Sequence, residues 1–117
     1  MMSQLRNTTR NDLLMASDLI KAHTFLGRGL GLLGKKELNP NSALWLKPCN
    51  NVHTLFMKFA LDIIFVDKNL VVTEIHRNVR PWKPLLVSWK SHSAFEFSAG
   101  ALHTKEVQIG DQLHVSD

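Results

Sequence analysis

The residues with the greatest chemical capacity lie in one segment, Cys49 to Asp62. The thiolate of Cys49, the imidazole of His53 and the carboxylate of Asp62 are all metal-binding groups. A structural zinc site needs four ligands, however, and this spacing matches no strong zinc motif, so we expect no metal and no cofactor. Cys49 and His53 could instead form a nucleophilic pair. The alternative that we favour is a structural cysteine and a histidine bonded to backbone groups.

Asp62 is the most informative single residue because it interrupts the apolar run Leu61 to Val66. Alternation along a strand places it on the same face as Ile64 and Val66. A carboxylate on a buried face is costly unless amides, a hydroxyl or a cation compensate for it. Asp62 therefore either fixes a loop through backbone amides or acts near His53 as a general base or ligand anchor. The structural role is slightly favoured, and both alternatives stay open.

Two further side chains extend the set of candidates. Glu96 alternates with Phe95 and Phe97, which places it on the opposite face of a strand, and a solvated face is the ordinary explanation for such a residue. If the strands that carry Asp62 and Glu96 face one cleft, the two carboxyl groups could share acid–base work. Trp82 lies in a proline-bracketed loop, so it is the tryptophan that we expect to be exposed and to contact a ligand or partner.

Short apolar runs separated by turn residues predict the elements that must position these side chains. Asp67-Lys68-Asn69 between two β-rich runs predicts a hairpin. Ser17 as an N-cap, followed by apolar residues at helical spacing, predicts a helix over about residues 18–26. We expect a mainly β fold (α+β) with one or two short helices and a compact, closed or folded-over antiparallel sheet. Strands are expected at 12–16, 43–46, 61–66, 70–75, 85–89, 94–98 and 112–115.

Length and composition indicate one domain over residues 12–117, preceded by a flexible segment over residues 1–11. The 117-residue chain has a single cysteine, which cannot form an intrachain disulfide and fits a reducing compartment. No apolar run is long enough for a signal peptide or a membrane span, so we expect a cytoplasmic protein. The net charge of +4 comes from scattered basic residues, whereas nucleic-acid binders concentrate them, so we do not expect nucleic-acid binding.

The segment from His53 to Asp67 resembles the motif of the bacterial and archaeal proteins called domain of unknown function 192. The resemblance covers about residues 22–113 and implies a compact, mainly β fold with no established activity. Met57, Asp62 and Glu96 match recurrent motif residues, whereas Ala60 stands where the family usually has proline. Three flanking segments also match the family pattern, namely Arg28-Gly29-Leu30, Glu96 to Gly100 and Ile109-Gly110-Asp111.

From these observations we expect a binding module for a small polar ligand or a partner protein. Its expected ligand-binding residues are His53, Met57, Asp62 and Trp82. The alternative is a small hydrolase in which Asp62 works with His53 or Glu96 as acid and base. The two hypotheses make different demands on geometry, because the hydrolase needs its acid and base within hydrogen-bond reach of one another or of one shared water.

Overall fold

A computed structural model describes residues 3–22, 38–47, 51–52, 59–81 and 86–117. These residues form nine strands and two short 3-10 helices, η1 (Thr8–Arg10) and η2 (Ala101–Thr104). The strands are β1 (Ser3–Asn7), β2 (Leu13–Ala22), β3 (Ser42–Leu46), β4 (Asn51–Val52), β5 (Leu61–Val66), β6 (Val72–Val79), β7 (Leu86–Val87), β8 (Ser93–Ser98) and β9 (Leu113–Ser116).

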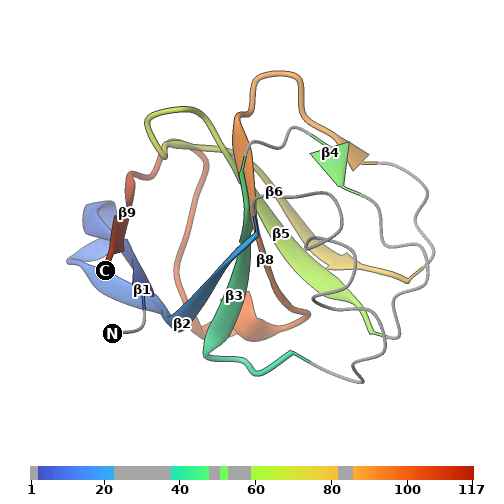
Figure 1. The fold of residues 1–117 in the computed structure, drawn as a ribbon, viewed down its shortest axis with the longest axis horizontal. Coiled ribbons are helices and arrows are strands. Elements are labelled where there is room, and N and C mark those ends of the chain that lie inside the picture. Colours follow the sequence, from blue (N-terminus) through green and yellow to red (C-terminus); the bar gives the residue numbers. More distant parts are fainter. Residues whose placement is uncertain (1–2, 23–37, 48–50, 53–58, 82–85) are drawn as a thin grey trace.

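Seven of these strands form one curled sheet in the order β6-β5-β8-β3-β2-β1-β9, and β4 pairs with β7 in a second, two-stranded sheet (Figure 1). A bridge between Val71 and Gln112 links the residue before β6 to the residue before β9. The two edges of the large sheet therefore approach each other, which gives a half-barrel. The expected mainly β fold is confirmed, with one difference: β2 and β3 run parallel, whereas the other neighbours in the sheet are antiparallel.

The central strands β3, β5 and β8 are buried on both faces, so each contributes to two groups of apolar side chains. The first cluster lines one face and includes Trp45, which stacks on Phe95 with ring centroids 5.4 Å apart. The second cluster covers the other face of the same strands. Its buried members are Leu38, Leu44, Leu46, Leu61, Ile63, Phe65 and Ala94, and Phe59, Val79 and Leu86 pack against them.

The prediction of a helix over residues 18–26 is wrong for residues 18–22, which the structure describes as the continuation of strand β2. Pairing with β3 explains this difference, since it runs in parallel register from Asp18 opposite Ser42 to Ala22 opposite Leu46. The Ser17 amide donates to the Asn41 carbonyl rather than starting a helix. Tertiary pairing here overrides a weak helical spacing.

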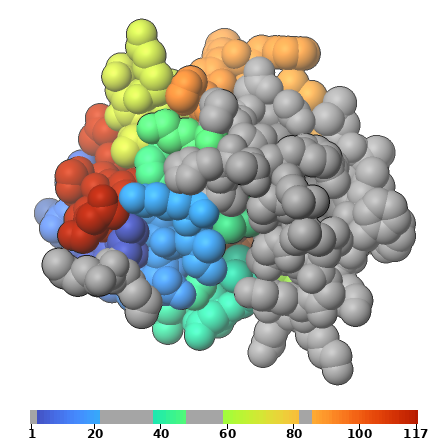
Figure 2. Space-filling model, in the orientation of Figure 1, coloured from blue at the N-terminus to red at the C-terminus, as the bar shows by residue number. Residues whose placement is uncertain are grey.

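The N-terminal segment also differs from its expected flexibility, because from residue 3 onwards it is part of the sheet. Strand β1 lies between β2 and β9 and pairs with both. Leu5 belongs to the first cluster and is fully buried. Figures 1 and 2 show the blue N-terminal strands against the red C-terminal strand at one end of the molecule. The sheet therefore begins well before the expected boundary at residue 12.

The hairpin of β5 and β6 is confirmed, and its turn forms through a local side-chain contact. The Oδ1 atom of Asp67 accepts hydrogen bonds from the amides of Asn69 at 2.8 Å and Val71 at 3.0 Å. Such carboxylate-to-amide contacts favour turns because they replace backbone pairing. The register of this hairpin determines which side chains of β6 lie beside those of β5.

Candidate functional site

Asp62 is buried, with 2% of its surface exposed, and both of its carboxylate oxygens accept hydrogen bonds from main-chain amides. Oδ1 accepts from the Asn78 amide at 2.9 Å. Oδ2 accepts from the amides of Gly100 at 3.0 Å and Leu102 at 3.3 Å. Asn78 and Gly100 have left-handed backbone conformations. Asp62 thus joins the end of β6 to the start of η2, and these contacts satisfy a charge that would otherwise be costly to bury.

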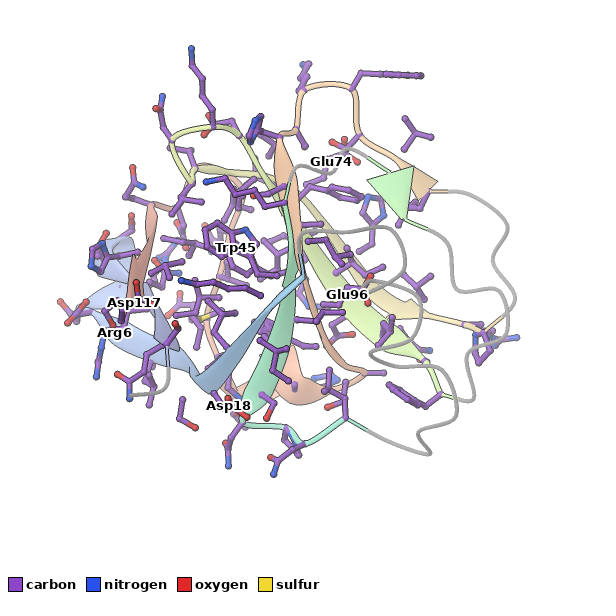
Figure 3. All side chains as sticks on the ribbon, viewed as in Figure 1. Arg6, Asp18, Trp45, Glu74, Glu96 and Asp117 are labelled. Carbon is purple, nitrogen blue, oxygen red and sulfur yellow. The ribbon has the colours of Figure 1, made fainter. Side chains whose placement is uncertain are left out.

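Asp62 and Glu96 do not form a pair, because they point to opposite faces of the sheet. In the antiparallel register of β5 and β8, Asp62 lies opposite Phe97 and Ile63 lies opposite Glu96. Residues directly opposite each other share a face, and consecutive residues alternate. Trp45 lies opposite Phe95 and therefore shares the face of Asp62, and Figure 3 shows Trp45 on one side of the strands and Glu96 on the other. Shared acid–base chemistry between Asp62 and Glu96 is therefore excluded by the geometry.

Glu96 lies in the middle of the second-cluster face rather than on a solvated one, so that part of the sequence interpretation is wrong. Leu44 of β3 and Ile63 of β5 flank it across the two neighbouring strands. Only 5% of its surface is exposed, and no hydrogen bond or ion pair joins its carboxyl to another described residue. Burial raises the pKa of Glu96 to about 8. The carboxyl group is consequently mostly protonated at neutral pH.

A second polar group lies on the same face at the edge strand β6. His76 is opposite Ile63, and Glu74 is opposite Phe65. The Nε2 atom of His76 lies 2.8 Å from Oε1 of Glu74, and the Ser88 hydroxyl donates to Oε2 of Glu74. The hydrogen bond from Ser88, together with His76, lowers the pKa of Glu74. We call Glu74, His76 and Ser88 the edge group; its Glu74 and His76 side chains are 36% and 31% exposed.

The charged side chains on this face are acidic, whereas the whole chain has a positive net charge. On strands β3, β5, β6 and β8, the charged side chains that the register places on the second-cluster face are Glu74 and Glu96. His76 is the other titratable group there, and the remaining flanking positions are apolar or serine. The complete chain carries a net charge of +4. The described face therefore combines two carboxyl groups and an imidazole with buried apolar side chains.

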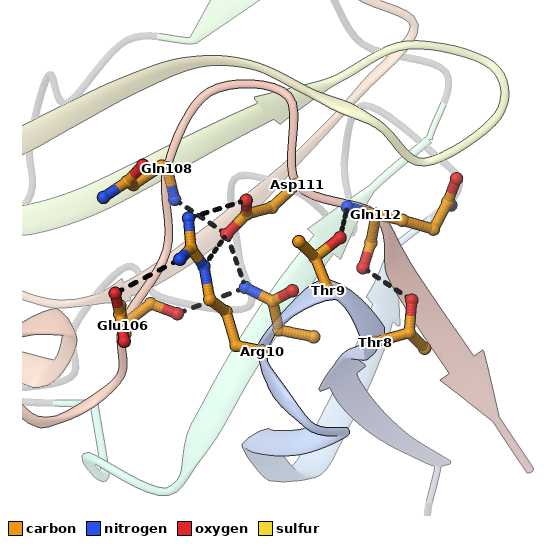
Figure 4. A network of polar contacts seen from close by, with 8 residues as sticks. Thr8, Thr9, Arg10, Glu106, Gln108, Asp111 and Gln112 are labelled. Atoms are coloured by element: carbon orange, nitrogen blue, oxygen red, sulfur yellow. Dashed lines mark hydrogen bonds and ion pairs between the residues drawn. The ribbon is translucent and has the colours of Figure 1, made fainter.

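A third polar network joins the two ends of the chain, and sequence reasoning missed it (Figure 4). Arg10 of η1 makes two contacts with Asp111, Nε to Oδ2 at 3.0 Å and Nη2 to Oδ1 at 3.1 Å. Asn7 Nδ2 donates to Oδ2 at 2.9 Å. Although burial opposes ionisation of Asp111, the bonds from Arg10, Asn7 and the Gln108 amide hold its pKa below the ordinary value. This network fixes β1 and η1 to the turn before β9.

The remaining residues singled out from the sequence, Cys49, His53, Met57 and Trp82, lie outside the described residues. Trp89, in the turn between β7 and β8, is 83% exposed, whereas the sequence analysis had selected Trp82 as the exposed tryptophan. Within the described ranges, no three His, Cys, Asp or Glu side chains lie close enough to hold a metal ion. No helix in this part of the chain is long and apolar enough to cross a membrane.

The fold is that of a mainly β protein built on a curled, half-barrel sheet. This sheet buries the carboxyl groups of Asp62 and Glu96. The sequence profile of the family described as uncharacterised ACR, domain of unknown function 192, matches residues 6–115. The chain belongs to this family, so the resemblance seen in the sequence is confirmed.

Relatives of the chain include two archaeal proteins and one solved bacterial structure. The UPF0127 protein PH1112 of Pyrococcus horikoshii is 28% identical over 98 residues, which cover 79% of this chain and 82% of that protein. The UPF0127 protein PF1050 of Pyrococcus furiosus is 30% identical over 98 residues, or 79% and 81% of the two chains. A protein of unknown function from Novosphingobium aromaticivorans has a TM-score of 0.79 at 19% identity, covering 96% of this chain and 82% of its own. The last similarity concerns the fold alone.

Proposed function

We propose that this protein is a non-catalytic binding module for a small organic ligand, held on the second-cluster face with Glu96 as its polar contact. One observation carries the proposal: only 5% of the surface of Glu96 is exposed, yet no hydrogen bond or ion pair joins its carboxyl group to another residue in the described part of the chain. An unpaired buried polar group costs about 1–3 kcal/mol. A ligand that bonds to this carboxyl would recover that cost.

Asp62 has a supporting role in this proposal rather than a ligand-binding one. Its two oxygens are engaged by the amides of Asn78, Gly100 and Leu102, and it lies on the other face of the sheet. By holding the backbone that follows β8, it fixes the strand that carries Glu96. His53, Met57 and Trp82 remain predicted ligand contacts.

The hydrolase alternative receives no support from the described geometry. Asp62 and Glu96 cannot work on one substrate atom from opposite faces of a sheet. A general base must reach the proton that it removes, directly or through one water. Pairing of Asp62 with His53 is the remaining form of that hypothesis, and no contact in the described residues favours it.

A fragment screen with methyl-labelled protein tests the proposal. Ligands of the second-cluster face should shift the methyl resonances of Leu44 and Ile63, which flank Glu96. The variant Glu96→Gln keeps the shape of the side chain but removes the acid, so it should weaken those ligands about tenfold. The matched control is Asp12→Asn, because the Asp12 carboxylate is 62% exposed. The proposal fails if no fragment moves these methyl groups, or if E96Q binds every such fragment as well as the native protein.

A further inference from the structure

We propose that three neighbouring turns form a surface that docks on an anionic phospholipid bilayer. The turns are residues 67–70, 88–91 and 108–111, and in each the amide of the fourth residue donates to the carbonyl of the first. We call their six central residues the turn surface, namely Lys68, Asn69, Trp89, Lys90, Ile109 and Gly110. All six are exposed. This proposal uses none of the residues assigned to ligand binding, so it is independent of the proposed function.

Contacts with strand β6 bring the three turns together. The first turn leads into β6, and Val72 makes two main-chain hydrogen bonds with the third, donating to the Asp111 carbonyl and accepting from the Gly110 amide. The hydroxyl groups of Thr73 and Ser91 lie 2.6 Å apart, which places the second turn beside the next residue of β6. Figure 1 shows the yellow-green, orange and red turns at the same end of the molecule, and in Figure 2 the first two project from it.

Exposed apolar side chains are the first evidence for docking. Trp89 and Ile109 are 83% and 67% exposed, and they are the most exposed large hydrophobic residues in the described ranges. Both occupy the second position of their turn. Tryptophan favours the boundary between lipid headgroups and hydrocarbon, because its ring is apolar and its N–H group is polar. Two such side chains on adjacent turns can enter a bilayer surface together.

Each turn is held in place by side-chain hydrogen bonds. Asp67 fixes the first turn through the amides of Asn69 and Val71. In the second turn, the Ser88 hydroxyl donates to Glu74 and lies 2.6 Å from the Ser91 hydroxyl. The bonds of Asp111 to Arg10, Asn7 and the Gln108 amide fix the third turn (Figure 4). Because the turns are already ordered, docking does not require their conformational entropy to be lost.

The charge of the turn surface indicates which bilayer it fits. Two of its six residues are lysines and none is acidic. The carboxylates that flank the turns are engaged within the structure: Asp67 with main-chain amides, Glu74 with Ser88, and both Glu106 and Asp111 with Arg10. Lysines at a membrane surface are attracted to anionic headgroups, and their long side chains let the ammonium group stay at headgroup level while apolar neighbours insert.

The shape and size of the turn surface favour a bilayer over other anionic partners. Sites for single-stranded nucleic acid combine a basic groove with several stacking aromatic rings, whereas Trp89 is the single aromatic residue among these six. Stable protein interfaces use about 20–30 residues on each side, which is far more than three turn tips provide. A projecting tip of apolar and basic residues can instead enter a deformable lipid surface.

Co-sedimentation of the full chain with vesicles tests the proposal. Vesicles of mixed phosphatidylserine and phosphatidylcholine are compared with vesicles of phosphatidylcholine alone. The protein is expected to bind the mixed vesicles with a blue shift of its tryptophan fluorescence, and this binding should weaken as salt is added. Trp89→Ala should weaken it about tenfold and remove most of the shift. Lys68→Gln and Lys90→Gln should each weaken it about fivefold.

Ile20→Ala and Arg77→Gln are the matched controls, because one removes an exposed apolar side chain of β2 and the other an exposed cation of β6. Arg77 lies five residues beyond Val72, about 16 Å along the strand, and this distance exceeds the Debye length of about 8 Å at physiological salt. Both controls should bind like the native protein. All variants should also match it in urea unfolding, since the substituted side chains are exposed.

Several results would overturn the proposal. Failure to sediment with the mixed vesicles would do so, as would full binding by W89A. Equal binding to both kinds of vesicle would contradict the role of Lys68 and Lys90. A thymidine oligonucleotide is titrated in parallel, and tighter binding to it that W89A abolishes would assign the turn surface to single-stranded nucleic acid. Self-association that W89A abolishes would assign it to a second copy of this chain.

Discussion

Replacing Glu96 by glutamine is expected to remove a pH-dependent loss of stability that the native protein shows between about pH 5 and pH 8. Burial raises the pKa of Glu96 to about 8, from an ordinary value of 4.5. The folded protein therefore keeps this proton over a pH range in which the unfolded chain has released it. Because the unfolded state binds fewer protons there, the free energy of unfolding falls as pH rises, and it levels off above about pH 8.

The size of this effect follows from the pKa difference. Each pKa unit corresponds to about 1.4 kcal/mol, so the rise to about 8 predicts a decrease on the order of 5 kcal/mol across the interval. Glutamine has no proton to release, so E96Q should show no such contribution. Near pH 5 the two proteins should have similar free energies of unfolding, because the neutral acid and the amide each cost about 1–3 kcal/mol when unpaired. Near pH 8, E96Q should be the more stable of the two.

Urea unfolding of both proteins over a series of pH values measures this difference. Glu74 and His76 share the face with Glu96, and both are present in the native protein and in E96Q, so subtraction of the two curves removes most of their contribution. D12N provides the control, since loss of the exposed Asp12 carboxylate should leave the pH dependence nearly unchanged. If the curves of the native protein and E96Q run parallel from pH 5 to pH 8, Glu96 is not an unpaired buried acid.

Three other substitutions test the supporting structure. Asp62→Asn should lower the free energy of unfolding by about 3 kcal/mol, because its amide cannot accept all three main-chain N–H groups; a loss near zero in urea unfolding would contradict this. Arg10→Met should lower the free energy of unfolding near neutral pH, because it removes both contacts with Asp111. Because the pKa of Asp111 is lowered in the folded protein, that difference should shrink as the pH falls below about 4, and a constant difference would argue against the assigned ion pair. Gly110→Ala should lower thermal stability by about 1–2 kcal/mol, since φ is +95° there although nothing lies near the added methyl group; an unchanged melting temperature would contradict a left-handed residue at this position.

Local alternation predicted the strands that form the centre of the sheet. The run from Leu61 to Val66 became β5 with the same bounds, and Ala94 to Ser98 became β8 after extension by one residue. Both strands have β-branched or aromatic residues bounded by turn residues, and this information is local to the sequence.

The edges of the fold depend on partners that are distant in sequence, which is why they were predicted less well. Residues 18–22 form a strand because they pair with residues 42–46 in parallel. Strand β1 is short and mainly polar, and its place in the sheet comes from pairing with β2 and β9 at opposite ends of the chain. Neither pairing leaves a periodic signal in its own segment.

Alternation also gave the correct face for Glu96 but not its burial. Whether a strand face is covered depends on tertiary packing, and here Leu38, Phe59, Val79 and Leu86 pack with the side chains of β3, β5 and β8. The sequence analysis missed the edge group. Glu74 and His76 are two residues apart on one strand, so alternation places both side chains on the same face. Recognising them required knowing that β6 pairs with β5 in the observed register.

The state of the Glu96 carboxyl can be measured directly by following its side-chain carboxyl carbon in a 13C NMR titration of the full chain. We expect an apparent pKa near 8, as the burial of the side chain implies. An apparent pKa near the ordinary 4.5 would contradict both the unpaired burial of Glu96 and its role as a ligand contact.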